Sequence, residues 1–440
     1  MPESDPRPTE LGPPRSSRTE RLYYQDSFLY EFEAKLVEIV SADSRPVLIL
    51  DRTAFYPTSG GQVFDMGGLW ADGQSEREGL QVVEVSEDED GRILHFVAER
   101  PRFGPGTKLH GRIDKERRCD HMQQHSGQHV LSAAFVRRFN IATVSFHMGA
   151  ESSSIDLDTK NLTADQLREA EALANDVVLE NRSVEIRFVT QQEAGGLGLR
   201  KIPTIEHQEL RLIDIHDFDL TGCGGTHVAS TGQIGSILLR KFEKVRQGWR
   251  VEFVCGKRAV ATAGRDYTTL VESAALCSGH IWDLPQQVRK IQEDTRVSRK
   301  ANELLLAELA DLWAARLMAE APRQGGSILI TRLFPDRDLG FIKLLAQKLT
   351  RQTTGVVALL GTTRDPPALV FAQSPGQPFD MAALMKEVLS RQGGRGGGSK
   401  EMAQGGPARC DELETVITEI AARLCAPEQG QDPPSRKHGT

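Results

Sequence analysis

The spacing of apolar residues divides the chain into regions of different secondary structure. From Phe32 to Asp114, short alternating runs are separated by turn residues, and Asp90-Gly91 between two such runs favours a hairpin, because both residue types tolerate positive φ. The pattern predicts an antiparallel β-barrel-like domain over residues 22–115, preceded by a disordered, proline-rich tail over residues 1–21.

Helical periodicity begins in the next region. The run from His121 to Arg138 places apolar residues on one helical face, namely Val130, Leu131, Ala134 and Phe135. Thr163 and Gln166 have the spacing of a capping box that opens a second helix, and strand-like runs follow it. Residues 116–258 are therefore predicted to form an α+β domain.

A long helix and a further domain are predicted in the remaining chain. The helix lies in a linker over residues 259–323, and its charged sequence carries an apolar stripe of Ala301, Leu305, Leu309 and Leu312. Such a stripe fits either a helix packed on its neighbours or an intermolecular coiled coil. Strands alternate with helices over residues 324–427, which predicts a C-terminal α/β domain, and the polar residues 428–440 predict a disordered tail.

A glycine-rich segment over residues 393–408 interrupts the C-terminal domain. Its composition is typical of a flexible loop. Arg391, Arg395 and Lys400 also favour a phosphate-contacting loop, since glycines let backbone N–H groups approach an anion closely.

Composition and charge limit the function classes. The 440 residues carry a net charge of −7, so binding to nucleic acid would require local basic patches, for which the candidates are Arg240, Lys241, Lys244 and Arg246. The six cysteines lack the close pairing of a disulfide framework, and no apolar run reaches the roughly 18 residues of a membrane span. We therefore expect a cytoplasmic protein that does not enter a membrane.

Two pairs of residues carry the strongest chemical signal. His125 and His129 are four residues apart on the predicted helix, so both imidazoles lie on one face, and Cys223 and His227 have the same spacing in a CGGTH turn. Three nitrogens and one thiolate suit tetrahedral Zn²⁺. His121, one turn before His125, is a competing ligand. Four protein ligands also fit a purely structural zinc, whereas a zinc protease is disfavoured because the glutamate of HExxH is missing.

A second chemical candidate is the run Ser59-Gly60-Gly61-Gln62, which predicts a tight turn with an exposed amide. It is either a plain β-turn or a substrate-contacting segment in which Gln62 hydrogen-bonds a reacting carbonyl or a positioned water. Thr226, within the CGGTH turn, either offers its hydroxyl to a substrate or stabilises the turn.

The motifs together resemble the editing half of alanyl-tRNA synthetase and, more closely, the freestanding long-form alanyl-tRNA editing proteins of the AlaX family. SGGQ, HSGQH, CGGTH and GGRGGGSKEMAQGGP follow one another in the family's order within about residues 22–425, with Ser126 where the family usually has Thr. The resemblance implies two sets of site residues. The zinc ligands are matched by His125, His129, Cys223 and His227, and the substrate-pocket segment by Gly60, Gly61 and Gln62.

The resemblance also implies an activity. We expect zinc-dependent hydrolysis of the ester that joins serine, or glycine, to alanine tRNA, with the C-terminal domain helping to hold the tRNA. A pocket sized for alanine admits glycine and excludes serine poorly, so a separate hydrolytic site restores discrimination. The aminoacylation domain is missing, so no charging activity is expected. The long helix or the C-terminal domain could form a homodimer, and a non-catalytic tRNA-binding protein with a structural zinc is the alternative.

Overall fold

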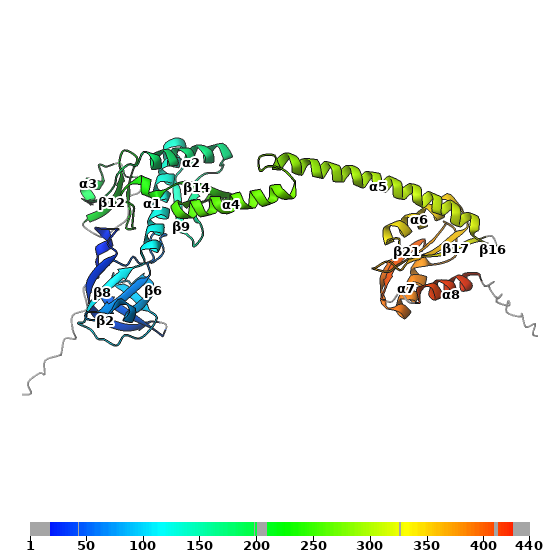
Figure 1. The fold of residues 1–440 in the computed structure, drawn as a ribbon, viewed down its shortest axis with the longest axis horizontal. Coiled ribbons are helices and arrows are strands. Elements are labelled where there is room, and N and C mark those ends of the chain that lie inside the picture. Colours follow the sequence, from blue (N-terminus) through cyan, green and yellow to red (C-terminus); the bar gives the residue numbers. More distant parts are fainter. Residues whose placement is uncertain are drawn as a thin grey trace, which may run out of the picture. The chain divides into compact units, whose positions relative to one another are not determined.

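The fold is mixed α+β and has more than one domain, as the sequence predicts. The computed structural model describes residues 18–42, 44–197, 199, 209–324, 327–408 and 412–425. It divides into two compact units, Met1–Glu272 and Ser273–Thr440 (Figure 1). Within the described ranges, no helix has both the length and the apolar character that a membrane crossing requires.

A closed antiparallel barrel forms the first part of the chain, with strand order β2-β3-β7-β6-β5-β8. Its strands are β2 (Glu31–Ala42), β3 (Arg45–Leu50), β5 (Gly67–Ala71), β6 (Leu80–Glu87), β7 (Ile93–Val97) and β8 (Lys108–Ile113). In β2, Phe32, Ala34 and Leu36 are buried while the residues between them are exposed. Gly91 has a φ of 78° between β6 and β7, where the hairpin is predicted. The alternation in sequence therefore predicts the barrel correctly.

The end of the predicted N-terminal tail belongs to the folded unit. Strand β1 (Glu20–Arg21) pairs in parallel with β4 (Arg52–Thr53). Thr19 is 4% exposed, and its hydroxyl donates to a backbone carbonyl of β3 at 3.1 Å. The tail is therefore wrongly predicted for residues 18–21, because strand pairing and burial fix them, while residues 1–17 lie outside the described part of the chain.

Helix α1 (Lys115–Phe139) begins directly after the last barrel strand. The Asp114 side chain caps it by accepting a hydrogen bond from the backbone N–H of Arg117 at 3.1 Å. Asn140 ends the helix in the left-handed conformation, with a φ of 54°. The middle of α1 is buried, including the predicted apolar face, so its polar residues there face the protein interior.

Two antiparallel sheets and several short helices complete the region around α1 (Figure 1). The sheets have strand orders β14-β15-β10-β9 and β11-β12-β13. The predicted capping box of Thr163 and Gln166 is confirmed at the start of α2. The remaining elements are β9 (Thr143–Met148), β10 (Ser153–Leu157), β11 (Val184–Thr190), β12 (Glu209–Ile215), β13 (Asp219–Gly222), β14 (Ile237–Val245), β15 (Gly248–Cys255), α2 (Ala164–Leu179), α3 (Gln191–Ala194), η1 (Leu22–Tyr24), η2 (Glu76–Glu78) and η3 (Thr231–Ile234).

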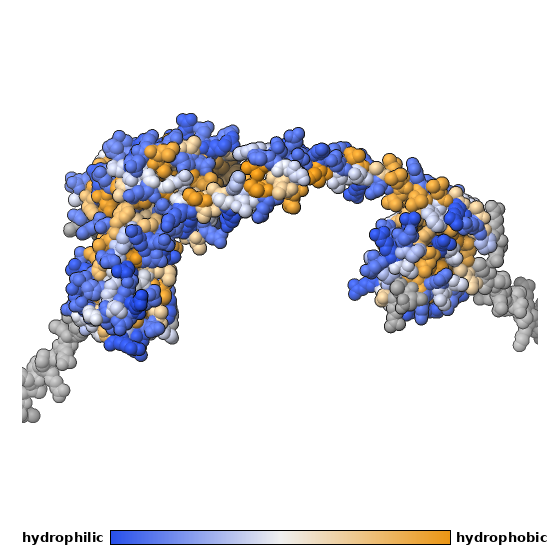
Figure 2. Space-filling view, in the orientation of Figure 1, coloured by the Kyte–Doolittle hydropathy of each residue, from blue (hydrophilic) through white to orange (hydrophobic). Residues whose placement is uncertain are grey.

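The predicted long helix is α5 (Leu284–Glu320), and α4 (Gly256–Leu276) precedes it. The predicted apolar stripe is not the packed face of α5, since Leu305 and Leu312 are 61% and 70% exposed. The buried residues of α5 are instead Ala310, Ala314 and Leu317. Figure 2 shows apolar surface along this helix. Leu309 of the stripe packs against the C-terminal core, so the prediction that the stripe packs on neighbouring elements is confirmed for that residue and wrong for Leu305 and Leu312.

The C-terminal domain has a six-stranded mixed sheet of order β16-β17-β18-β19-β21-β20. Helices α5 and α6 cover one face, and α7 and α8 cover the other, which confirms an α/β architecture. The elements are β16 (Arg323–Gln324), β17 (Ser327–Phe334), β18 (Val356–Thr362), β19 (Ala368–Gln373), β20 (Gly394–Gly398), β21 (Met402–Pro407), α6 (Leu339–Gln352), α7 (Met381–Gln392) and α8 (Leu413–Cys425).

The glycine-rich segment is an edge hairpin and not the predicted loop. Strand β20 pairs with β21 in antiparallel register, and every residue of β20 is exposed. A Cβ at Gly405 would lie 2.6 Å from Cδ1 of Leu389 in α7. Glycine is therefore favoured there, because a Cβ would have to displace the Leu389 side chain where the strand packs against the helix.

Candidate metal centre

The structure brings together the four residues that the sequence predicts to be metal ligands. Their ligand atoms all lie within 4.8 Å of one another, in the group formed by His125, His129, Cys223 and His227. The three histidines are 2–4% exposed, and Cys223 is partly exposed. Helix α1 supplies two ligands one turn apart, and the loop after β13 supplies the other two. Nitrogen and sulfur donors in this number fit a tetrahedral zinc site.

Each histidine has a polar neighbour on the side of its ring that faces away from the cluster. The Nδ1 atom of His125 lies 2.7 Å from Oε1 of Gln62, and Nδ1 of His227 lies 3.1 Å from Oγ of Ser126. The Nε2 atoms of the same two rings lie 3.5 and 3.3 Å from the Cys223 sulfur. The Nδ1 contacts therefore favour rings that carry the proton on Nδ1 and present Nε2 to a metal.

The charge states of the cluster also suit metal binding. Desolvation acts to raise the pKa of the Cys223 thiol, but His125 and His227 hold that pKa well below its usual value. Burial lowers the pKa of His227 to about 3, so its ring is neutral at pH 7. A thiolate and neutral imidazoles are the forms that coordinate a metal. The donor set therefore fits Zn²⁺ in geometry, and Cys223 and His227 also have the protonation states that coordinate a metal.

The SGGQ segment forms the predicted tight turn beside this cluster. Backbone hydrogen bonds join Ser59 and Gln62 in both directions, at 3.1 and 2.9 Å. Gly60 and Gly61 have φ values of 56° and 85°, which non-glycine residues adopt at a cost. A Cβ at Gly61 would lie 2.4 Å from the carbonyl oxygen of Phe146, whereas a Cβ at Gly60 would have no atom within 4 Å. Gly61 is therefore required by packing, and Gly60 faces open space.

The exposed amide predicted for Gln62 is not found. Gln62 and Thr226 are both 0% exposed. The Gln62 amide donates through Nε2 to the Thr226 hydroxyl at 2.8 Å, and its Oε1 accepts from the backbone N–H of Thr226 at 3.1 Å. Because the same Oε1 also contacts His125, the amide is fully engaged within the protein. It links the barrel turn to both metal-ligand segments.

A buried ion pair that the sequence does not signal holds the same turn against α1. Arg118 and Asp65 are both 0% exposed and hydrogen-bonded to each other. The Asp65 carboxylate also accepts from the backbone N–H of Tyr56 at 2.7 Å, so it closes the loop that contains SGGQ. Arg118 precedes His125 by seven residues, or two helical turns, and therefore lies on the same side of α1.

The glycines of CGGTH allow the metal-ligand loop to approach α1. A Cβ at Gly225 would lie 2.1 Å from Cε1 of His125. The buried Arg211 holds the loop by donating to the carbonyl oxygen of Cys223 at 2.6 Å.

His121, the competing ligand in sequence, does not join the cluster. It is 2% exposed, and burial lowers its pKa to about 4.

The predicted basic residues do not form one free patch. Arg240 and Lys241 are ion-paired with neighbouring carboxylates, whereas Lys244 and Arg246 have no ion pair among the residues that the structure describes. Arg391, Arg395 and Lys400 belong to the second unit, where Arg391 is paired with Glu387 at 3.1 Å and the other two are exposed.

Comparison with known proteins shows relatives over most of the chain. A model of class II (A) tRNA synthetases matches residues 15–117, and one of the second additional domain of threonyl and alanyl tRNA synthetases matches residues 210–251. The chain is 30% identical over 406 residues to the alanyl-tRNA editing protein AlaX-L of Pyrococcus horikoshii, covering 91% of this chain and 98% of that protein. The chain belongs to the AlaX-L family of alanyl-tRNA editing proteins.

This AlaX-L family chain is also related to longer proteins. It is 31% identical over 414 residues to the alanine–tRNA ligase of Pyrococcus furiosus, covering 92% of the chain and 44% of the ligase. The ligase of Archaeoglobus fulgidus gives 31% identity over 420 residues and the same 44% coverage of the ligase. The chain thus spans less than half the length of these ligases.

Among solved structures, the C-Ala domain of Aquifex aeolicus alanyl-tRNA synthetase matches 24% of the chain and 98% of that domain, at 20% identity and a TM-score of 0.23. Within the AlaX-L family chain, Cys223 and His227 lie inside the matched second additional domain, and His125 and His129 lie outside it.

Proposed function

We propose that the protein is a trans-editing hydrolase that removes serine, and also glycine, from mischarged alanine tRNA by zinc-dependent ester hydrolysis. Homology to an alanyl-tRNA editing protein supports the substrate class. The observation that carries the reaction type is the convergence of three imidazoles and one thiolate within 4.8 Å in a buried site. Zinc bound there would polarise an ester carbonyl or make a bound water acidic.

Around the metal position, the protein holds side chains and a backbone turn in fixed positions. We propose that Gln62 and Thr226 contribute to catalysis by orienting His125, since the Gln62 amide is engaged with both residues and buried. The turn at Gly60 and Gly61 would form one wall of the substrate pocket. Gly60 faces open space, so an aminoacyl group can approach the backbone there closely.

The partly exposed Cys223 marks the side on which substrate would reach the cluster. The other three ligands are 2–4% exposed, so their protein neighbours exclude water from them. Four protein donors fill a tetrahedral shell, so hydrolysis at the metal requires one ligand to loosen or the coordination number to rise.

The same closed shell supports a second candidate, a tRNA-binding protein whose zinc is structural. Turnover separates the two functions. The first experiment compares release of serine, glycine and alanine from alanine tRNA by the wild type and by Cys223→Ala, with zinc content measured on both. Release of serine or glycine with alanine retained, lost in the variant, supports the hydrolase. A zinc-loaded wild type that binds tRNA without releasing any amino acid refutes it.

We further propose that tRNA is held by local basic residues in both units, which overcome the net charge of −7. In the first unit, Lys244 and Arg246 are the better candidates because the neighbouring Arg240 and Lys241 are neutralised by carboxylates. In the C-terminal domain, the proposed contacts are Arg391, Arg395 and Lys400. Binding through phosphates would weaken as salt rises.

A homodimer through α5 or the C-terminal domain is the proposed assembly. The support is the exposed apolar surface of α5, where Leu304, Leu305 and Leu312 are 61–70% exposed. Replacing Leu305 and Leu312 with glutamate should convert a dimer to a monomer in light scattering. An unchanged mass would exclude this face of α5 as the interface.

A further inference from the structure

The outer contacts of the three histidines differ in chemistry. His125 faces the neutral amide of Gln62, and His227 faces the hydroxyl of Ser126. His129 faces a carboxylate instead, with its Nδ1 atom 3.7 Å from Oδ2 of Asp219. The sequence reasoning does not single out Asp219, because a single acid at the start of a strand has no distinctive spacing.

Asp219 is held in a protected position beside the cluster. It is the first residue of β13, four residues before Cys223, and its side chain is 4% exposed. The His129 side chain is 5% exposed, so the contact has little access to bulk water. An ionised carboxylate is costly to bury without a positive or hydrogen-bonding partner. The imidazole of a metal-bound histidine, with its proton on Nδ1, is such a partner.

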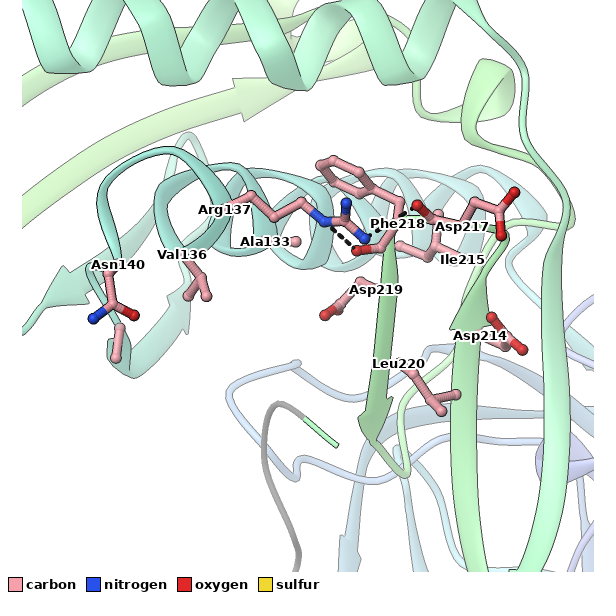
Figure 3. A pocket seen from close by; sticks show the side chains of 11 residues that line it. Ala133, Val136, Arg137, Asn140, Asp214, Ile215, Asp217, Phe218, Asp219 and Leu220 are labelled. Carbon is pink, nitrogen blue, oxygen red and sulfur yellow. Dashed lines mark hydrogen bonds between the residues drawn. The ribbon is translucent and has the colours of Figure 1, made fainter. Parts of the chain in front are cut away.

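A cavity of about 630 Å³, which Asp219 lines, lies between the C-terminal part of α1 and the β12–β13 hairpin (Figure 3). Its only lining cation within the described chain is Arg137, which donates to the backbone carbonyls of Phe218 and Asp217 at 2.8 and 3.1 Å. Arg137 therefore fixes the turn that precedes Asp219.

The other two acids that line this cavity face different partners. Asp214 is paired with Arg187 at 2.8 Å, and Asp217 lies 3.4 Å from the His216 ring and is 83% exposed. Among the three carboxylates of the cavity, Asp219 is thus the one that the structure places against a predicted metal ligand.

We propose that Asp219 is a positioning residue for the metal centre. Its carboxylate lies 3.7 Å from Nδ1 of His129, and its negative charge favours the proton on that nitrogen, which leaves Nε2 to face the metal and strengthens it as a ligand. It also supplies a negative charge near the cation in addition to that of the Cys223 thiolate. The inference rests on the proposed zinc site, and it assigns to Asp219 no contact with substrate.

The test measures metal binding by the full-length chain. Asp219→Asn keeps the size of the side chain and removes its charge, and Asp217→Asn is the matched control from the same cavity. Zinc affinity is measured by competition with a chromophoric chelator, and the visible absorption of the cobalt-substituted protein reports ligand geometry. We expect roughly 10- to 100-fold weaker zinc binding and an altered cobalt spectrum for Asp219→Asn, with both unchanged for Asp217→Asn.

The unfolding temperature of each metal-free protein separates metal positioning from a general folding role. It should be similar for the wild type and Asp219→Asn. If Asp219→Asn does not fold, the smaller Asp219→Ser is measured in the same way. Failure of both variants to fold, or zinc affinity equal to wild type, overturns the proposal. Absence of zinc binding by the wild type would instead overturn the metal site itself.

Discussion

Breaking the buried pair of Arg118 and Asp65 is expected to destabilise the first unit strongly. Both side chains are 0% exposed. Arg118 also donates to the backbone carbonyls of Ser27 and Ala54 at 2.8 and 2.6 Å, so its guanidinium stays in place when Asp65 is removed. The Asp65→Ala variant would therefore bury a positive charge without a counter-charge.

The size of the effect follows from burial. Removing one partner of a buried ion pair costs about 3–5 kcal/mol. Asp65→Ala also leaves the backbone N–H of Tyr56 without its acceptor at 2.7 Å, which costs about 1–3 kcal/mol where water cannot replace it. The two terms share one carboxylate and are not additive, so we expect a total near the upper part of the first range.

The assay is urea unfolding at pH 7, followed by far-ultraviolet circular dichroism, with the free energy of unfolding taken from the transition of the first unit. Glu31→Ala is the matched control, because Glu31 is 68% exposed and pairs with Arg112 at 3.0 Å on the same barrel. An exposed pair contributes at most about 1 kcal/mol. If Asp65→Ala costs no more than Glu31→Ala, the buried pair does not fasten the barrel loop to α1.

Three further outcomes are expected. Gly61→Ala should reduce thermal stability and the rate of deacylation more than Gly60→Ala does. The reason is that only at Gly61 would the new Cβ clash, at 2.4 Å from a carbonyl oxygen. Equal effects of the two variants would contradict this. Burial lowers the pKa of His95 to about 4 in the folded protein, so unfolding takes up a proton below pH 6.5. The free energy of unfolding should therefore fall from pH 6.5 toward pH 4, by at most about 1.4 kcal/mol per pH unit. Urea unfolding of His95→Gln should show a shallower dependence. Neutralising Lys244 and Arg246 should reduce the salt dependence of tRNA binding without zinc loss, and an unchanged slope would remove these contacts.

Elements with a clear hydrophobic period are predicted well. The barrel strands, α1, α2, α5 and the α/β alternation of the C-terminal domain all follow from it. Strand β20 is missed because its glycines carry no pattern of alternate side chains, and its pairing with β21 depends on backbone hydrogen bonds alone. The exposure of Leu305 and Leu312 on α5 does not follow from the sequence, because periodicity identifies an apolar face without showing which element, if any, covers it.

The metal cluster is predicted because its ligands occur as two short-range pairs. Each pair has a spacing of four residues, which local geometry explains. The residues that support the ligands have no such local signal. Arg118 and Asp65 are 53 residues apart, and Gln62 and Thr226 are 164 apart, so their contacts exist only once the barrel has packed against α1 and the CGGTH loop. Sequence reasoning therefore finds the ligands and misjudges Gln62 as an exposed group.

These long-range contacts make the barrel part of the candidate metal centre. Its SGGQ loop is fastened at three points: Gln62 contacts His125, Asp65 contacts Arg118, and the carbonyl of Gly61 accepts from a backbone N–H of β9 at 3.0 Å. Two of these points lie on the helix that carries two metal ligands. Any displacement of the barrel relative to α1 would therefore move the Nδ1 partner of His125. The turn at Gly60 and Gly61, whose positive φ values suit glycine, places the Gln62 amide between His125 and Thr226, so a rigid attachment of the barrel holds that amide in place beside the cluster.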